Sequence, residues 1–342
     1  MKALVLEEYG RFVYKDVPDP NYGDGDVVID VKAASICGSD VHGYDGSSGK
    51  RKPPLIIGHE VSGIISATGK EVTKYIKGDR VVFNSVFYCR DCWYCRRGMS
   101  NMCSNGKVFG VASDDYHLDG GMCEKISVPE YILYKIPDSV DFVSASLIEP
   151  LSIAIHAVDG ADIRMNDSVV VFGAGTIGLM LLKVLKNSSA SKVICVDLDL
   201  EKMELARQNN ADLVIDGRKD VPTIIREYTK GQGVDWAFEA VGISDTINNA
   251  LNSLRKGGTL IQLGNIKPSI DFPLQRLVTN ELKIIGRYAT SNEYAKAIDM
   301  LASGRVSVKD CISKVAPLDE GQIWFDKLHA MKKGLVKVVL IP

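Results

Sequence analysis

The first part of the chain alternates short apolar runs with turn-forming residues. Residues 27–31, 64–67 and 80–83 are mostly apolar and rich in Val and Ile, which is typical of β-strands. Stretches rich in Gly, Pro and Asp, such as residues 22–25 and 77–79, separate these runs and are typical of turns. The pattern continues to about residue 145 and predicts an irregular, mostly β domain.

The pattern changes near Ser144, where helical stretches begin to alternate with wholly apolar runs. Residues 169–172 are entirely apolar, and residues 176–185 continue as a helix. Strands this apolar are typical of a parallel sheet covered by helices on both faces. The chain as far as Gly286 therefore predicts a doubly wound α/β domain. Its other predicted elements are a helix over residues 200–209 and strands over residues 192–196, 234–238, 259–263 and 282–285.

The last segment is mixed, with a predicted helix over residues 293–301 and a predicted strand over residues 337–341. Chain termini often lie close together, and a dinucleotide-binding domain can be inserted into another domain. We therefore expect the last segment to rejoin the first domain. The predicted domains are residues 1–146 with 287–342, and residues 147–286.

The composition narrows the function. The 342 residues are 46% hydrophobic and carry a net charge of -2, which gives no reason to expect a nucleic acid or an anionic membrane as a partner. Two acids follow the short apolar run at residues 3–6, so a signal peptide does not fit, and no apolar run reaches the ~20 residues of a membrane span. We expect a cytoplasmic protein whose eight cysteines are thiols or metal ligands.

A glycine fingerprint, Gly173-x-Gly175-x-x-Gly178, follows the apolar strand at residues 169–172. Such glycines permit a tight turn, close approach of a pyrophosphate and close helix packing. Asp197 ends the next predicted strand, where a carboxylate accepts ribose hydroxyls and repels a 2′-phosphate, which favours NAD over NADP. The alternative is a helix-capping Asp197 in a cofactor-free α/β protein. Further expected cofactor contacts are Thr176, Ile177, Val241, Leu263, Gly264 and Lys202, the last of which is equally well explained as a solvated lysine.

Four cysteines, Cys89, Cys92, Cys95 and Cys103, follow the spacing C-x2-C-x2-C-x7-C. Four thiolates this close in sequence can surround one tetrahedral zinc ion, and closed coordination leaves no open position, so the predicted site is structural. The alternative is an iron–sulfur cluster, but the spacing differs from the ferredoxin runs.

Two further motifs lie upstream. One is C-G-S-D-V-H at residues 37–42, and the other is G-H-E-x2-G-x5-G-x2-V at residues 58–72. With these motifs, the chain resembles the zinc-containing medium-chain dehydrogenases over nearly its whole length. Residues 37–42, A-S-L-I-E-P-L-S at residues 145–152 and the pair Arg287-Tyr288 resemble the sorbitol and polyol dehydrogenase branch. The resemblance implies a GroES-like, mostly β catalytic domain and a Rossmann dinucleotide-binding domain.

The resemblance also implies the ligands of a catalytic zinc ion. Cys37 and His59 are expected as ligands. For the third position, the resemblance to the polyol branch implies Glu60, with Glu149 holding a water. Resemblance to threonine- and galactitol-phosphate-type enzymes implies Glu149 itself, so both acids remain candidates. The alternative for Glu149 is an acid that stabilises a helix N-terminus, and a site of this composition also accepts Mn²⁺ or Co²⁺.

Residues next to these ligands are expected to move the proton released by alcohol oxidation. Ser39 is expected to take it first and His42 to pass it to solvent. Asp40 is a candidate for orienting the ring of His59, with a turn-forming role as the alternative.

Arg287 and Tyr288 resemble the hydroxyl-binding pair of sorbitol dehydrogenases and can donate to several hydroxyls. For Arg287 the alternative is an ion pair between domains. Tyr44 is a candidate pocket wall, or else packs in the core, and Glu149 is also placed at the substrate. The basic residues 50–52 are either a solvated loop or a site for a substrate phosphate.

The predicted function is zinc-dependent oxidation of a sugar alcohol, such as sorbitol or xylitol, to a ketose with NAD. The alternatives are a dehydrogenase of a phosphorylated polyol, such as galactitol phosphate or arabitol phosphate, or of L-threonine, and a non-catalytic nucleotide-binding protein. We expect one catalytic and one structural zinc ion per chain. The resemblance implies a homodimer or homotetramer, with residues 282–285 as a sheet-extending contact.

Overall fold

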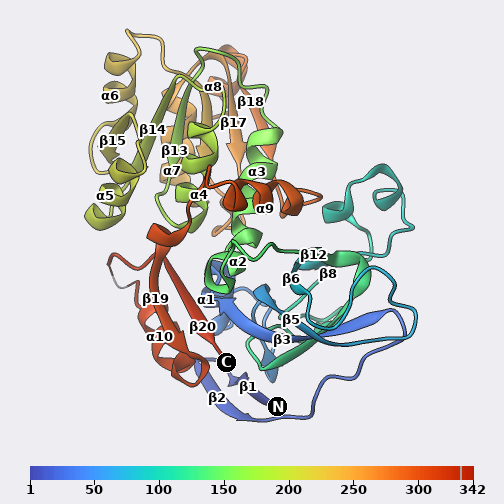
Figure 1. Cartoon of the computed structure of the whole chain (residues 1–342). Coiled ribbons are helices and arrows are strands. Elements are labelled where there is room, and N and C mark those ends of the chain that lie inside the picture. The colour runs from blue at the N-terminus through green and yellow to red at the C-terminus, as the bar shows by residue number, and fades with distance from the viewer. Residues whose placement is uncertain (332) are drawn as a thin grey trace. The chain divides into compact units, whose positions relative to one another are not determined.

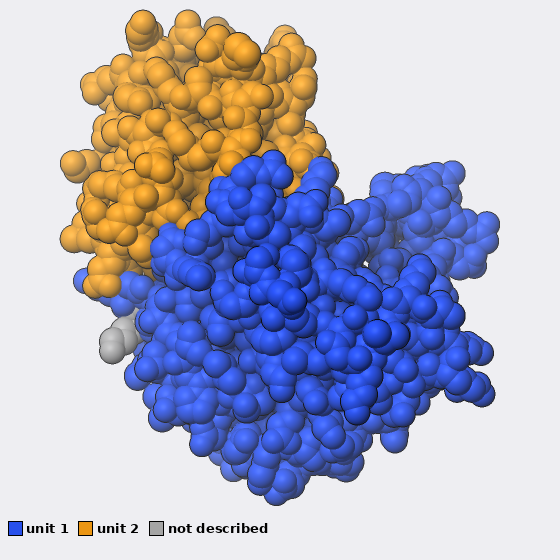
Figure 2. Space-filling model, viewed as in Figure 1, with its two compact units in different colours: residues 1–152, 290–342 blue, residues 153–289 orange. Residues whose placement is uncertain are grey.

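The chain divides into two compact units in the computed structural model, which describes residues 1–331 and 333–342 (Figure 2). Unit 1 comprises residues 1–152 and 290–342, and unit 2 comprises residues 153–289. The chain first passes from unit 1 to unit 2 within helix α3 (Ile148–Asp159). Among the described residues, no helix combines the length and apolar character needed to cross a membrane.

Unit 1 is built on β-strands, as the alternation of apolar runs and turns predicts. The last strand of the chain lies inside its largest sheet, one strand from the edge, where Leu340 is opposite Ala34. In spatial order this sheet contains β12 (Leu133–Lys135), β6 (Arg80–Phe83), β5 (Glu60–Thr68), β3 (Asp26–Ser35), β20 (Lys337–Ile341) and β19 (Ile312–Pro317), with β11 (Lys125–Pro129) also paired to β3 (Figure 1). Buried apolar residues of β3, β5 and β6, such as Ile29, Ile65 and Phe83, form part of its core.

The other elements of unit 1 surround this sheet. Its smaller sheets pair β2 (Arg11–Asp16), β1 (Lys2–Glu8) and β4 (Leu55–Ile56), then β7 (Val86–Phe87) with β8 (Lys107–Val108), and β9 (Val111–Ala112) with β10 (His117–Leu118). Its helices are α1 (Gly38–Tyr44), α2 (Phe142–Ser146), α9 (Tyr294–Ala302) and α10 (Gly321–His329). Short 3-10 turns lie at Cys95–Arg97, Ser100–Met102, Glu130–Ile132, Lys309–Cys311 and Leu318–Glu320.

Unit 2 is a parallel sheet of six strands with helices between them (Figure 1). In spatial order the strands are β15 (Leu213–Asp216), β14 (Lys192–Asp197), β13 (Ser168–Phe172), β16 (Val234–Glu239), β17 (Leu254–Gln262) and β18 (Lys283–Gly286). The helices are α4 (Thr176–Lys186), α5 (Leu200–Gln208), α6 (Val221–Tyr228), α7 (Ser244–Ser253) and α8 (Leu274–Thr279). The strand order reverses at β13, which is the usual place for a dinucleotide in such folds.

The apolar central strand explains why this sheet is covered on both faces. Val170 and Phe172 of β13 pack in one core cluster with Ile225 of α6 and Ile247 of α7. The intervening Val171 points to the other face of the sheet and is also fully buried. A strand buried on both faces requires apolar residues at every position.

Candidate active site

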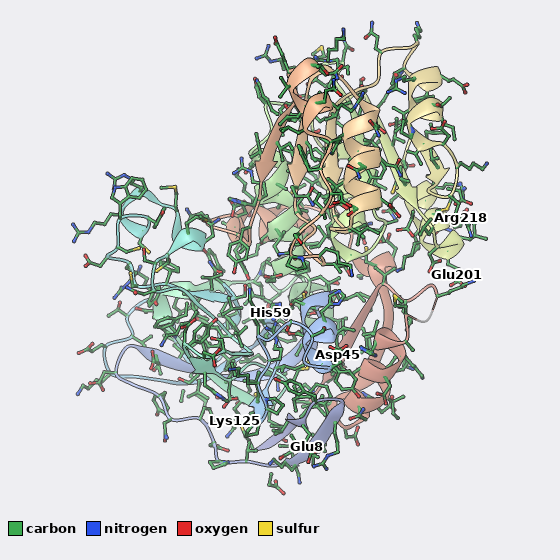
Figure 3. All side chains as sticks on the ribbon, turned by 180° about the vertical axis from the view of Figure 1, so that it is seen from behind. Glu8, Asp45, His59, Lys125, Glu201 and Arg218 are labelled. Atoms are coloured by element: carbon green, nitrogen blue, oxygen red, sulfur yellow. The ribbon has the colours of Figure 1, made fainter. Side chains whose placement is uncertain are left out.

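Strand pairing in unit 1 brings the two upstream motifs together. β3 and β5 are antiparallel with Ser35 opposite Glu60, so Cys37, just after β3, lies beside His59, just before β5. The ligand atoms of Cys37, His59 and Glu60 all lie within 4.8 Å of one another. His59 and Glu60 are 5% and 1% exposed, so both side chains are buried (His59 is labelled in Figure 3). A partly buried thiol with a buried imidazole and a buried carboxylate at this spacing fits a zinc ion.

A buried ion pair lies behind His59. Asp40 of α1 is fully buried, and its Oδ1 is 3.5 Å from Nδ1 of His59. The same oxygen accepts hydrogen bonds from Nε and Nη2 of Arg51, at 3.1 and 2.9 Å. Burial lowers the pKa of His59, but the charges of Asp40 and Cys37 outweigh it and raise the pKa to about 10. Asp40 therefore lies where a carboxylate orients a metal-binding histidine.

Glu60 forms a buried ion pair with Lys337, which the sequence analysis did not predict. Nζ of Lys337 donates to both carboxylate oxygens of Glu60, at 2.9 and 2.7 Å, and the hydroxyl of Ser35 donates to Oε2. Lys337 is 1% exposed, and the charge of Glu60 raises its pKa against the opposing effect of burial. The sequence does contain a signal for this pair: Lys337 is the one charged residue among the otherwise apolar residues 336–340, and a lysine in a buried strand needs a buried acidic partner.

Glu149 is buried in the same unit with one oxygen free. Oγ of Ser85 donates to its Oε1 at 2.9 Å, whereas Oε2 is buried without a hydrogen-bond partner among the described residues. The hydroxyl of Tyr294 accepts a hydrogen bond from the backbone N–H of Ser85 at 3.2 Å. Burial and the neighbouring Glu60 raise the pKa of Glu149 to about 7, against the opposing charge of His59. A buried oxygen without a partner fits the position of a metal ligand.

The other residues predicted on α1 differ in their surroundings. Ser39 and His42 are exposed, and Oγ of Ser39 accepts a hydrogen bond from Nη2 of Arg51 at 3.3 Å. Tyr44 is 5% exposed, and its hydroxyl lies 2.5 Å from the carbonyl oxygen of Gly10 and 2.6 Å from Oδ1 of Asp326. Tyr44 therefore packs in the core, and its hydroxyl is already hydrogen-bonded within unit 1.

The four clustered cysteines form a second candidate metal site. Their sulfur atoms all lie within 4.8 Å of one another. Backbone N–H groups of Cys95 and Ser104 lower the pKa of Cys92, whereas burial and the neighbouring thiols raise the pKa of Cys95. The loop carries exposed residues such as Trp93, at 57%, and offers little core of its own. Four sulfurs in this arrangement fit a structural zinc ion.

The glycine fingerprint in unit 2 has the conformation that dinucleotide binding requires. Gly173 has φ +93°, and a Cβ on Gly178 would lie 1.6 Å from the carbonyl oxygen of Gly173, so both positions need glycine. At Gly175 no atom lies within 4 Å of the same point, which leaves open space for a pyrophosphate. Thr176 and Ile177 begin α4, whose N-terminal N–H groups favour an anion.

Asp197 lies at the end of β14, as predicted, with its carboxylate held by the backbone. Oδ2 accepts from the N–H of Ala174 at 2.5 Å, and Oδ1 accepts from the N–H of Leu198 and Asp199 at 2.7 and 2.8 Å. These bonds fix the carboxylate beside the fingerprint. Lys202 lies in the first turn of α5. This position is compatible both with a cofactor contact and with a solvated lysine.

The remaining predicted cofactor residues lie in the loops after β16 and β17. Val241 packs on the fingerprint, because its Cγ2 lies 2.7 Å from the point that a Cβ on Gly173 would occupy. The N–H groups of Leu263 and Gly264 both donate to the carbonyl oxygen of Glu239 at 2.9 Å. These loops lie at the carboxyl ends of the strands, where ligands of such sheets bind.

Arg287 and Tyr288 follow β18 in unit 2. The guanidinium of Arg287 lies against Gly160, where a Cβ would be 1.4 Å from Nη2. Its Nε is buried and has no hydrogen-bond partner among the described residues. Tyr288 is 55% exposed. The Nε–H group of Arg287 is therefore available to donate a hydrogen bond to another group.

Comparison with known proteins gives matches over both units. The family model of the alcohol dehydrogenase GroES-like domain matches residues 23–138, and that of the zinc-binding dehydrogenases matches residues 176–303. D-xylulose reductase A of Aspergillus oryzae is 35% identical over 341 residues, which cover 96% of this chain and 94% of the relative.

Solved structures agree with these matches. An alcohol dehydrogenase from Thermus is 31% identical, with a TM-score of 0.91 over 100% of this chain and 99% of that one. An NADP-bound zinc-binding dehydrogenase from Sinorhizobium meliloti is 29% identical, with a TM-score of 0.91 and the same coverage.

These matches confirm the family and the fold class predicted from the sequence. They also confirm the class of enzyme, a dehydrogenase of alcohols or polyols with a nicotinamide cofactor. The chain belongs to the zinc-containing medium-chain alcohol dehydrogenase superfamily, in its polyol-dehydrogenase-like branch.

Proposed function

We propose that the protein oxidises a secondary alcohol of a small sugar alcohol to a ketose, with NAD as the hydride acceptor. The observation that carries this proposal is the group of Cys37, His59 and Glu60, whose ligand atoms all lie within 4.8 Å of one another, in a chain that also contains the glycine fingerprint. A relative named D-xylulose reductase A, 35% identical over nearly the whole chain, supports a five-carbon ketose and its polyol as the pair to test first.

The catalytic zinc ion is assigned to Cys37, His59 and Glu149. When bound there, zinc supplies a Lewis acid that lowers the pKa of the substrate hydroxyl. Oε2 of Glu149 is buried without a partner, whereas both oxygens of Glu60 already accept hydrogen bonds from Lys337. Glu60 belongs to the group whose ligand atoms lie within 4.8 Å of one another, and Glu149 does not, but Glu60 must give up its ion pair with Lys337 to bind a metal ion. Asp40 and Arg51 orient His59 from behind.

Ser39 and His42 are assigned to the path of the released proton. Both are exposed on α1, three residues apart, so they share one side of the helix. Arg51 donates to Oγ of Ser39, which leaves the proton of this hydroxyl free to be passed on. The order of transfer is from the substrate hydroxyl to Ser39, then to His42, and then to solvent.

NAD is assigned to unit 2, with Gly173, Gly175 and Gly178 at the pyrophosphate. The fixed carboxylate of Asp197 favours ribose hydroxyls over a 2′-phosphate. Although the Sinorhizobium relative is NADP-bound, this carboxylate supports NAD for the present chain.

Arg287 is assigned to the substrate hydroxyls, with Tyr288 beside it in sequence. The buried Nε of Arg287 without a partner supports this role. Tyr44 is not assigned to the substrate pocket, because its hydroxyl already contacts Gly10 and Asp326. The basic residues 50–52 give little support to a phosphorylated substrate, since Arg51 is buried against Asp40 and Lys52 pairs with Asp114.

Three further assignments complete the proposal: a structural zinc ion, a location and an oligomeric state. The four clustered cysteines hold a structural zinc ion, so that each chain carries two. We also assign the protein to the reducing cytoplasm, where cysteines serve as thiols or metal ligands. We also propose a homo-oligomer, in which β18 extends the sheet of unit 2 into a second chain.

Metal analysis combined with a substrate panel tests this function. We expect two zinc ions per chain and reduction of NAD, in preference to NADP, by free polyols such as xylitol and sorbitol. Mild chelation is expected to remove one ion and abolish turnover. Turnover of phosphorylated polyols or threonine alone would contradict the substrate assignment. One tightly held ion with no turnover of any alcohol would contradict the catalytic site.

A further inference from the structure

Glu239, the last residue of β16, carries a fully buried carboxylate in unit 2. Its oxygens accept hydrogen bonds from the N–H groups of Val241 and Gly242 at 3.0 and 2.9 Å. They also accept from Oγ1 of Thr246 at 2.7 Å and from Nε2 of Gln262 at 2.5 Å. Burying a carboxylate is costly unless donors replace its water. Here four donor groups do so. Three belong to residues that follow β16, and the fourth is the side chain of Gln262 in β17.

The main chain of the same residue joins the two strand ends a second time. The carbonyl oxygen of Glu239 accepts from the N–H groups of Leu263 and Gly264, and Nε2 of Gln262 also donates to the carbonyl oxygen of Gly264 at 2.7 Å. The two loops touch through their backbones, because a Cβ on Gly242 would lie 2.2 Å from the backbone nitrogen of Asn265. Residues 240–243 and 263–265 therefore form one assembly around Glu239.

This assembly is attached to the glycine fingerprint. The N–H of Ala240 donates to the carbonyl oxygen of Phe172 at 3.0 Å, and the side chain of Val241 packs on Gly173. β13 and β14, with the fingerprint and Asp197, belong to one mononucleotide-binding half of the fold, while β16 and β17 belong to the other. A dinucleotide that places its adenosine at Asp197 places its nicotinamide half over the loops that Glu239 holds.

We propose that Glu239 is a positioning residue for the nicotinamide half of the cofactor. Its carboxylate fixes the loops after β16 and β17 in one arrangement, so that their backbone groups meet the nicotinamide ring without rearrangement. The adenosine half is held separately by the fingerprint and Asp197. This inference rests on the proposed function, since it requires that unit 2 binds NAD.

The test compares two ligands on the full-length, zinc-loaded protein. NADH contains both halves of the cofactor, whereas ADP-ribose lacks the nicotinamide ring. In Glu239→Gln, the amide NH₂ group replaces one acceptor and faces the donors of Gly242 or Gln262. Since a buried donor left without an acceptor is costly, we expect the Kd for NADH to rise about tenfold or more. The Kd for ADP-ribose is expected to stay within about twofold of the wild type.

Gln262→Leu provides a milder second variant, because it keeps the carboxylate and three of its four donor groups, and removes only the hydrogen bonds from Gln262 to Glu239 and Gly264. It is expected to change NADH binding in the same direction by a smaller factor. Glu227→Gln, at an exposed position on α6, is the matched control and should change neither ligand. In steady-state assays the loss should fall on the KM for NAD more than on kcat.

The possible outcomes separate the inference from the function on which it rests. Unchanged NADH binding in both variants would overturn the positioning role and leave the proposed function intact. Equal loss of NADH and ADP-ribose would show that Glu239 supports the whole unit, and would also overturn the role. A wild-type protein that binds neither ligand would overturn the proposed function itself.

Discussion

At the scale of single residues, the two buried glutamates of the proposed catalytic site differ in the hydrogen bonds that their oxygens already accept. Glu60 is paired with Lys337, and both side chains are 1% exposed. Glu149 has one oxygen without a partner among the described residues. A buried ion pair loses several kcal/mol when only one partner is removed, so Glu60 is held in place by Lys337. Glu149 is free to turn its open oxygen to a metal ion.

The metal content of two variants tests which glutamate is the ligand. Glu149→Ala is expected to lower the affinity of the catalytic zinc site by about 100-fold or more and to leave one structural ion per chain. The double variant Glu60→Gln with Lys337→Met removes the buried pair as a unit, which is often nearly neutral for stability. It is expected to retain both ions in equilibrium dialysis. Full zinc in Glu149→Ala together with loss in the double variant would make Glu60 the ligand.

At the scale of elements, the amino ends of three strands in unit 2 are joined by one carboxylate. Asp235 of β16 accepts hydrogen bonds from the N–H and Oγ of Ser168 in β13, at 2.7 and 2.9 Å. It also accepts from Nε of Arg255 in β17 at 2.6 Å. This cross-link lies at the end of the sheet opposite the fingerprint loop. It stabilises the strand order without taking part in the site.

The stability of Asp235→Asn is expected to depend on pH. Burial raises the pKa of Asp235, but the hydrogen bonds from Ser168 and Arg255 outweigh it and lower the pKa below the ordinary value. The stabilisation is therefore present above the unfolded pKa of about 4 and is lost as the pH falls through the folded pKa. We expect the variant to lose about 1–2 kcal/mol at pH 7.

The check is urea unfolding of wild type and variant at pH 7, 5 and 3.5. The difference in unfolding free energy should stay constant down to about pH 5 and narrow below about pH 4. Asp271→Asn, at an exposed position in the same unit, should unfold like the wild type throughout. A difference that widens on acidification would contradict the direction of the pKa shift.

At the scale of the whole molecule, the edge of the parallel sheet is exposed and apolar. β18 is its last strand, and Ile284 is 40% exposed. Leu274 and Val278 of the adjoining α8 are 64% and 66% exposed. Unpaired strand edges favour pairing with another chain, and exposed apolar patches favour association. Two copies related by a two-fold axis would cover this edge in both chains.

Ile284→Asp tests this contact, because it puts a charge into the proposed interface. We expect the dimer to dissociate at concentrations about tenfold or more above those at which the wild type dissociates. Sedimentation equilibrium measures the change, and Met165→Asp, at a position of unit 2 that is 82% exposed, is the matched control. An unchanged molecular mass for Ile284→Asp would rule out β18 as the contact.

Much of the fold could be predicted because it depends on local pattern. The apolar run at residues 169–172 lies in β13, and the helix predicted over residues 200–209 corresponds to α5. β17 begins at Leu254, five residues before the predicted start at residue 259. Its first part contains Lys256, Gly257 and Gly258, whose local preference is for a turn. Leu254 pairs with Val234 and Thr259 with Trp236, so residues 255–258 form an irregularity in the strand, where Gly257 keeps a φ of +73°.

The sequence by itself determined the features that depend on near neighbours. Four cysteines within fifteen residues converge on one point, and the glycine spacing after an apolar strand defines the fingerprint. The tertiary structure alone decided which distant groups share a buried charge. Lys337 reaches Glu60 across 277 positions, and Gln262 reaches Glu239 across 23. The physical reason is that such partners are chosen by strand order and register, which local sequence does not encode, while a buried charge is stable only where that packing supplies its partner.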